Sequence, residues 1–360
     1  MAFRIVSFIL IAFLVSNVNA LEIRNVRPDR LTFDPGQGEI MAITYELSDP
    51  AAVELLIYDA RNYLVDRRTD QELVAGERTI TWGGKDFSDT IVPSEAYHYV
   101  LKATASSGES QTYDLTDLTG GQRLNVTDVE WDSSSGGIRY RLSETARVAI
   151  RIGLKDNGPL LRTLVEWVPR MSGSNEEDWD GWDQSNVLEL GDHPNLSIFV
   201  DAYALSDNTI MVGAPPRQSR FIQTNAGQEE SRQRQPTEKK AMYNHSDQPI
   251  ESRGGVDVSL SLESSYARED GVTAVSGTVP IQFNISSGDL RRAMDRRFET
   301  VFFVDGIFAH ENEVGYVPAT WHWDTTDVNP GIHYVTVNFR GYEGNFGVAT
   351  LKVFVESPDK

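Results

Sequence analysis

The sequence contains no cysteine, and this absence removes several classes of protein at once. Disulfide bonds, thiol catalysis, cysteine-ligated zinc and lipid attachment at a cysteine are all excluded. Each domain must therefore be stabilised by its own hydrophobic core, which favours domains of about 90 residues or more.

Long hydrophobic runs are also missing, apart from one at the start of the chain. Residues 1–20 carry one early basic residue, Arg4, then a mostly apolar run and a small final residue, Ala20. This layout predicts a secretory signal peptide that is cut before Leu21, and a retained anchor is the alternative. We therefore expect a mature chain without an integral membrane span, located in the periplasm or outside the cell.

Basic residues are few, and this restricts the classes of partner that the protein can bind. Removal of residues 1–20 leaves 32 basic against 53 acidic residues, a formal net charge of −21. Such a surface repels phosphate backbones and anionic lipids, which argues against nucleic acid and lipid surfaces as partners. Solubility of an exported protein accounts for the charge, and a basic partner or bound cations are the alternatives.

Motifs of catalysis are absent from the sequence as well. It has no Gly-x-Ser-x-Gly elbow, no glycine-rich phosphate loop, no dinucleotide fingerprint, no His-Glu-x-x-His zinc helix and no haem-attachment motif. We therefore expect a protein that is not an enzyme and that carries no cofactor.

A repeated pattern fills the first half of the mature chain. YELSDPAAVELLI (45–57) and YRLSETARVAIRI (140–152) match at a constant offset of 95 residues. Both alternate apolar with polar or small residues, as half-buried strands do. The sequences at 48–51 and 143–146 predict a hairpin turn within each stretch.

The repeat continues through Trp82 and Trp179, which lie 97 residues apart. Each tryptophan is followed by a glycine turn and later by a strand rich in aromatic and branched residues. The chain therefore carries two copies of one unit of about 95 residues. Many short strands with closely spaced turn signals predict an all-β protein of tandem β-sandwiches.

These segments resemble the Ig-like domain of the flagellar hook-capping protein. The first copy supplies the elements of the family pattern in order: FDPGQGE (33–39), YELS (45–48), VELLIYD (53–59), Trp82-Gly83-Gly84-Lys85-Asp86 and Tyr97. It departs from the family at Gly83, where the family has aspartate, and at Glu95, where it has glycine. The second copy keeps Trp179-Asp180-Gly181 but lacks the clean tyrosine at the opening of the last strand.

The resemblance covers about residues 24–212 and implies tandem Ig-like or fibronectin-like β-sandwiches. It implies a structural role for six residues: Trp82, Gly84, Tyr97, Trp179, Asp180 and Gly181. The module is a generic spacer and interaction unit, so the resemblance implies little about function. The segment that precedes it in hook-capping proteins has no room here, and we do not expect cap activity.

Composition changes after residue 213. Residues 214–255 are rich in Gln, Glu, Arg and Pro and poor in branched side chains, which predicts a disordered linker. The alternative is a segment that folds on binding around Phe221 or Tyr243. The expected organisation is a signal peptide (1–20), two repeat domains (21–113 and 114–213), the linker (214–255) and a C-terminal domain (256–360).

The C-terminal domain has the pattern of a further sandwich, although it is not an obvious third copy. Strands are expected at 279–286, 300–306, 333–340 and 349–357, with a hairpin turn at Asp305-Gly306, and a short helix at 290–297. WHWDTTDVNPGIHYVTV (321–337) resembles the later half of a bacterial Ig-like domain. This resemblance implies a structural role for Trp323 and Gly331.

Two groups of residues could bind a metal. The acidic turn EEDWDGWD offers calcium candidates at Asp178, Asp180 and Asp183, but its spacing is not that of a calcium-binding hand. Asp180 is better explained as a partner of backbone amides in the turn. A second group could also act in acid–base chemistry: His310, Glu311, Glu313, His322 and Asp324. On alternating strands such side chains usually face solvent.

Exposed tryptophans could stack on sugar rings, and four are candidates: Trp131, Trp167, Trp182 and Trp321. Three hydrophobic cores would use most of the seven tryptophans. Our leading expectation is therefore an exported, non-catalytic component of the cell envelope or surface that binds a protein partner. A carbohydrate-binding protein and an enzyme with a C-terminal site are the alternatives. The sequence does not predict the oligomeric state.

Overall fold

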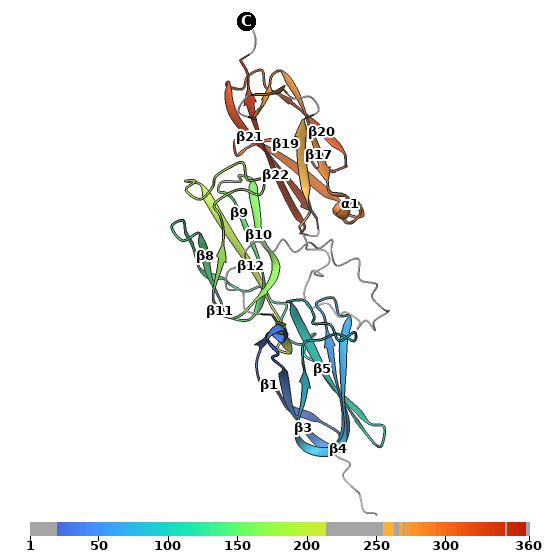
Figure 1. The fold of residues 1–360 in the computed structure, drawn as a ribbon. Coiled ribbons are helices and arrows are strands. Elements are labelled where there is room, and N and C mark those ends of the chain that lie inside the picture. Colours follow the sequence, from blue (N-terminus) through green and yellow to red (C-terminus); the bar gives the residue numbers. More distant parts are fainter. Residues whose placement is uncertain (1–19, 214–254, 263–265, 269–270, 343, 358–360) are drawn as a thin grey trace, which may run out of the picture.

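A computed structural model describes residues 20–213, 255–262, 266–268, 271–342 and 344–357. Figure 1 shows three β units arranged one after another, with the C-terminus at the far end of the third. Strands dominate each unit, so the expected all-β class is confirmed. Residues 1–19 of the expected signal peptide, Phe221, Tyr243 and nearly all of the expected linker lie outside the described residues.

Unit 1 is a seven-stranded sheet that folds over on itself around a core of alternating apolar side chains. It contains a short 3-10 helix, η1 (Pro35–Gln37), and these strands: β1 (Ile23–Pro28), β2 (Thr32–Phe33), β3 (Met41–Tyr58), β4 (Leu64–Trp82), β5 (Ala96–Ala105), β6 (Ser110–Tyr113) and β13 (Thr209–Val212).

The expected hairpin at 48–51 is wrong, because β3 runs through this segment without a turn. Its first half, up to Leu47, pairs with β1, and its second half, from Ala51, pairs with β5. The strand therefore passes from one layer of the sandwich to the other at a bend. The buried positions keep their alternation on both sides of it, which explains why the sequence pattern looked like two strands.

Unit 2 repeats this arrangement with its long strands divided in two. Its sheets are ordered β10-β9-β12 and β11-β8-β7. The strands are β7 (Thr127–Asp132), β8 (Gly137–Leu142), β9 (Ala146–Leu154), β10 (Leu160–Arg170), β11 (Gly173–Asp178) and β12 (Leu196–Ala204). The expected hairpin at 143–146 is wrong too, because β8 and β9 lie in different sheets.

The repeat is visible in the strand register. In unit 1, Leu47 pairs with Gly76, and in unit 2, Leu142 pairs with Gly173. These positions are 95 and 97 residues apart, the offsets that the sequence shows. The two halves of β3 in unit 1 thus correspond to β8 and β9 in unit 2.

Strand β13 differs from expectation, because the sequence boundary at 213 placed it in the second domain. After leaving unit 2 the chain returns to unit 1, where β13 pairs antiparallel with β5 and parallel with β2. Unit 2 is therefore inserted between β6 and β13 of unit 1. Two chain crossings join these units instead of one.

Unit 3 is a sandwich of one three-stranded and one six-stranded sheet, ordered β14-β17-β20 and β15-β16-β22-β21-β18-β19. Its strands are β14 (Val258–Leu262), β15 (Tyr266–Ala267), β16 (Thr273–Val275), β17 (Thr278–Ile285), β18 (Phe298–Val304), β19 (Ile307–Asn312), β20 (Ala319–Asp324), β21 (Gly331–Gly341) and β22 (Phe346–Val355).

Local features of unit 3 follow its sequence. The hairpin between β18 and β19 is confirmed, and Asp305 and Gly306 both have the positive φ that its turn needs. The expected helix forms as α1 (Ser287–Met294), three residues earlier than the pattern placed it. Among the described residues, no helix has the length and apolar character needed to cross a membrane.

Candidate functional site

The residues implied by the family resemblance meet inside unit 1. The Trp82 indole is buried, donates from Nε1 to the carbonyl oxygen of Lys85 at 2.9 Å, and contacts the rings of Phe33 and Tyr97 edge-on. Gly84 has φ +67°, and a Cβ there would lie 2.7 Å from Pro35. Only glycine fits this turn against the core.

Unit 2 uses the same arrangement. Trp179 is buried and donates from Nε1 to the carbonyl oxygen of Trp182 at 2.9 Å, and Gly181 has φ +81°. The Asp180 carboxylate accepts the backbone N–H of Trp182 at 3.0 Å. Both tryptophan turns therefore position a core side chain.

The three calcium candidates do not converge. Asp183 is fully buried, and its Oδ1 accepts the N–H groups of Val187 and Leu188 at 2.8 and 2.9 Å. The Asp180 carboxylate accepts a backbone hydrogen bond within its own turn, and Asp178 is exposed on β11. Within the described ranges, no three His, Asp or Glu side chains are placed to hold a metal ion.

The C-terminal histidine group is divided between surfaces. The His310 ring stacks on Trp321 at 5.8 Å, whereas His322 points away from the core on β20. Asp324 accepts hydrogen bonds from the side chain and backbone of Thr326, which lower its pKa. The structure does not bring these residues together as one site.

His333 belongs to a contact that the sequence did not suggest. Its Nδ1 lies 2.6 Å from Asp305 Oδ2, and its Nε2 lies 2.7 Å from the carbonyl oxygen of Asn329. Burial of the ring opposes protonation, but these hydrogen bonds outweigh it and raise the pKa of His333. The pair fixes the β18–β19 turn to β21.

In unit 3, Trp323 and Gly331 lie at the end of the sandwich near His333. The Trp323 ring is buried and contacts the Trp321 and His333 rings. Gly331 opens β21 with φ +144°. Both residues shape the fold here and neither faces a cavity that the structure describes.

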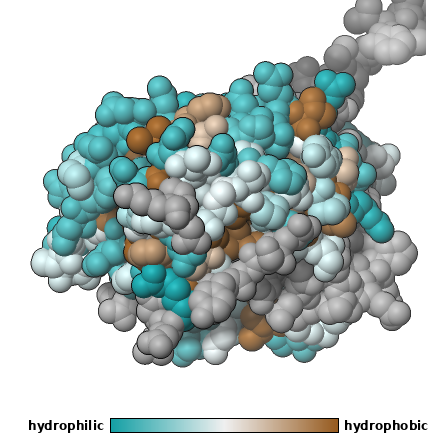
Figure 2. Space-filling view, turned by 90° about the horizontal axis from the view of Figure 1, so that it is seen from above, coloured by the Kyte–Doolittle hydropathy of each residue, from teal (hydrophilic) through white to brown (hydrophobic). Residues whose placement is uncertain are grey.

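Most sugar-binding candidates are occupied by protein contacts. Trp131 packs on Trp179 and donates to the carbonyl oxygen of Gly191, Trp167 contacts Tyr203, and Trp321 contacts Phe302. Trp182 is 38% exposed and so offers the most accessible ring of the four. On the face seen from above in Figure 2 most residues are hydrophilic, and the hydrophobic residues form separate small patches.

A cation held between aromatic rings lies where units 2 and 3 meet. The Arg151 guanidinium of β9 lies 4.3 Å from the ring centre of Phe346 in unit 3 and 5.6 Å from that of Trp167 in unit 2. Arg151 Nη2 also lies 3.4 Å from Glu166 Oε1. We call these four residues the Arg151 contact.

Hydrogen bonds extend the junction between units 2 and 3. Asn338 of β21 accepts the N–H of Leu160 at 2.8 Å and donates to its carbonyl oxygen at 2.7 Å. Its side-chain amide thus pairs with the edge of β10 as a neighbouring strand would. The N–H of Thr350 donates to Ser185 Oγ at 2.8 Å. Beside Phe346 a pocket of about 310 Å³ is lined by Glu299, Arg340, Gly341, Tyr342 and Gly344.

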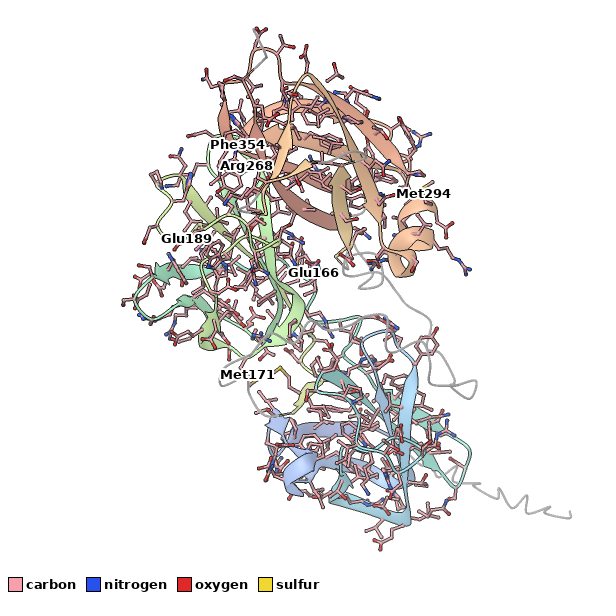
Figure 3. The ribbon with its side chains drawn as sticks, turned by 45° about the horizontal axis from the view of Figure 1, so that its top comes forward. Glu166, Met171, Glu189, Arg268, Met294 and Phe354 are labelled. Atoms are coloured by element: carbon pink, nitrogen blue, oxygen red, sulfur yellow. The ribbon has the colours of Figure 1, made fainter. Side chains whose placement is uncertain are left out.

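Glu166 gives this junction a pH dependence. Figure 3 shows it on the side of unit 2 that faces the helix of unit 3. Burial of its carboxyl group raises its pKa to about 7, although Arg151 and Arg292 of α1 oppose the shift. Two guanidinium groups therefore act on the Glu166 carboxyl group. One of them, Arg151, also lies 3.8 Å from a second carboxylate, measured from Arg151 Nη1 to Asp201 Oδ2.

We expect the junction to weaken as the pH rises from 4.5 to about 7. A carboxyl group whose pKa is raised by folding stabilises the fold through its bound proton. That contribution is complete below the ordinary value of 4.5 and is lost as the pH passes about 7. The loss is roughly 2–3 kcal/mol, measured by denaturation across this range. Glu166→Gln should remove it, and exposed Glu189→Gln (labelled in Figure 3) should not. If the free energy of unfolding depends on pH equally in both variants, Glu166 is not the group responsible.

Comparisons with known proteins give structural neighbours only. No protein-family model matches the sequence, and no curated protein matches it. The fibronectin(III)-like modules of Clostridium thermocellum CbhA align over 92% of this chain and 94% of theirs, with 11% identity and a TM-score of 0.21. A bacterial ice-binding adhesin studied for retention at the host cell surface aligns over 94% and 99%, with 12% identity and a TM-score of 0.18.

A third neighbour, the dimeric latent PorU of Porphyromonas gingivalis, aligns over 94% of this chain but only 34% of its own, with 8% identity and a TM-score of 0.22. These neighbours are Ig-like or fibronectin-like modules of bacterial surface and secreted proteins. Their low scores carry no functional argument, so the proposal below rests on this molecule's own geometry.

Proposed function

We propose that the protein is an exported, non-catalytic binding protein of the bacterial envelope or cell surface. Units 1 and 2 act as a stiff spacer, and unit 3 is held at its end for a protein partner. The signal-peptide pattern and the acidic composition support export. The tandem Ig-like units support a spacer.

The return of the chain through β13 is the observation that carries this proposal. A single linker between two sandwiches allows them to swing, whereas two crossings fixed by strand pairing resist it. At this junction Arg147 Nη2 lies 2.8 Å from Glu95 Oε1, which ties unit 2 to the rim of unit 1. Figure 1 shows unit 2 between units 1 and 3.

Exposed apolar side chains make unit 3 the binding end. Ile307 and Phe308 of the edge strand β19 are 73% and 55% exposed, and Val314 and Tyr316 follow in the next loop. An edge strand can pair with a strand of a partner. An extended protein segment therefore fits this side of unit 3.

A photo-activated cross-linker at Tyr316 tests the proposal in producing cells. We expect it to capture one envelope or surface protein, and a linker at exposed Glu130 of unit 2 to capture none. Capture at neither position, together with glycan binding lost on Trp182→Ala, would favour the carbohydrate alternative. A turnover activity lost on changing His322 or Asp324 in the folded protein would overturn the non-catalytic assignment.

A further inference from the structure

The first residue after the expected cleavage point is built into unit 1. The Leu21 side chain is only 3% exposed and belongs to the hydrophobic core of this unit. Its backbone nitrogen lies 3.0 Å from Glu109 Oε1. Ala20, by contrast, is exposed.

Two hydrogen bonds with Ser48 hold the next residue, Glu22. The N–H of Glu22 donates to Ser48 Oγ at 2.9 Å, and the N–H of Ser48 donates to the carbonyl oxygen of Glu22 at 3.1 Å. Residue 23 then begins β1. The backbone at Leu21 is therefore fixed before the first strand starts.

We propose that Glu109 is the binding site for the α-ammonium group of the mature N-terminus at Leu21. A signal peptidase adds water across the Ala20–Leu21 peptide bond, which gives Ala20 a carboxylate and Leu21 an amine. The amine takes up a proton near neutral pH. An amide N–H that donated to the Glu109 carboxylate thereby becomes a cation paired with it.

A carboxylate in direct contact with this nitrogen suits a cation. Glu109 contacts it directly, and the Asp49 carboxylate accepts a hydrogen bond from Ser48 Oγ at 2.9 Å. Arg24, the basic residue that follows three positions later in the sequence, is paired with Glu22. Charge-assisted hydrogen bonds are stronger than neutral ones, so cleavage strengthens a contact that the fold already provides.

Burial of Leu21 also orders the events. A peptidase needs an accessible, extended chain at the bond it cuts, and in the folded unit the residue after that bond is in the core. Cleavage therefore precedes closure of unit 1 around Leu21. This inference does not depend on the binding function proposed above.

The first test is the mass of the N-terminal peptide of the exported protein. We expect it to begin at Leu21, and a different start would overturn the proposal. The second test is the rate at which the N-terminal amine is acetylated. Glu109→Gln should raise this rate about fivefold, and the hydrogen-exchange rate of the Glu22 and Ile23 amides by a similar factor.

A variant with Gly-Ser inserted before Leu21 is the matched control. It keeps the Leu21 amide next to Glu109 but moves the ammonium away. In this background, Glu109→Gln should change both rates less than twofold. An equal effect in the two backgrounds would show a neutral hydrogen bond and overturn the ion pair. Because Glu109 is exposed on a turn, the variant should fold, and Glu109→Asp provides a milder second one.

Discussion

Replacement of Arg170 by methionine is expected to lower the free energy of unfolding of unit 2 by about 3–5 kcal/mol. Arg170 and Glu177 are 6% and 2% exposed, and Arg170 Nη2 lies 2.9 Å from Glu177 Oε2. The Tyr140 hydroxyl donates to Glu177 Oε1 at 3.0 Å. Removal of the guanidinium leaves a buried carboxylate without its cation, which is more unfavourable than loss of one hydrogen bond.

Hydrogen exchange of the β8 and β9 amides measures this loss in unit 2 alone. Exposed Arg141→Met on β8 is the control and should change stability by less than about 0.5 kcal/mol. The double variant Arg170→Met/Glu177→Gln should recover part of the loss because the uncompensated charge is gone. Equal effects of Arg170→Met and Arg141→Met would contradict this account of the unit 2 core.

Replacement of Asn208 by alanine is expected to loosen the junction of units 1 and 2. Asn208 is fully buried, and its Nδ2 donates to the carbonyl oxygen of Tyr99 at 2.8 Å and to Thr116 Oγ1 at 3.2 Å. The side chain thus connects unit 1 with both chain crossings. Loss of these bonds leaves buried acceptors unpaired, which should lower the free energy of unfolding by about 2 kcal/mol.

The expected readout is local. The amides of β13 should exchange about 30-fold faster in Asn208→Ala, since about 1.4 kcal/mol corresponds to a factor of ten. Asn195→Ala, at an exposed position of unit 2, should leave them unchanged. If β13 exchanges at the wild-type rate in both variants, Asn208 does not hold the junction.

Local pattern and composition predicted the fold class well, because alternation records which face of a strand is buried. The odd positions of β3 from Met41 to Leu47 and from Ala51 to Ile57 are buried, as the alternation in the sequence indicated. The same alternation could not show that β3 bends between layers, since burial continues on both sides of the bend. A proline in the segment suggested a turn where the structure has a bent strand.

Long-range pairing was beyond the sequence. Thr209–Val212 is a short strand whose partners, His98 and Phe33 among them, lie more than 100 residues earlier. The Arg151 contact was equally hidden, because Arg151 looks like any polar residue on an alternating strand. The sequence offers one indication of it, a charged residue between two apolar neighbours, Ile150 and Ile152. Glu109 stood in an ordinary polar turn, and only the buried Leu21 gives it significance.

We expect the three units to move as one body that holds unit 3 at a fixed distance from unit 1. Since the chain has no cysteine, pairs of introduced cysteines can be spin-labelled uniquely. Exposed strand positions Thr81, Arg141 and Thr320 place one label in each unit. Pulsed electron resonance between Thr81 and Arg141 and between Arg141 and Thr320 should give a single narrow distance for each pair. A broad or multiple distribution for either pair would contradict the account.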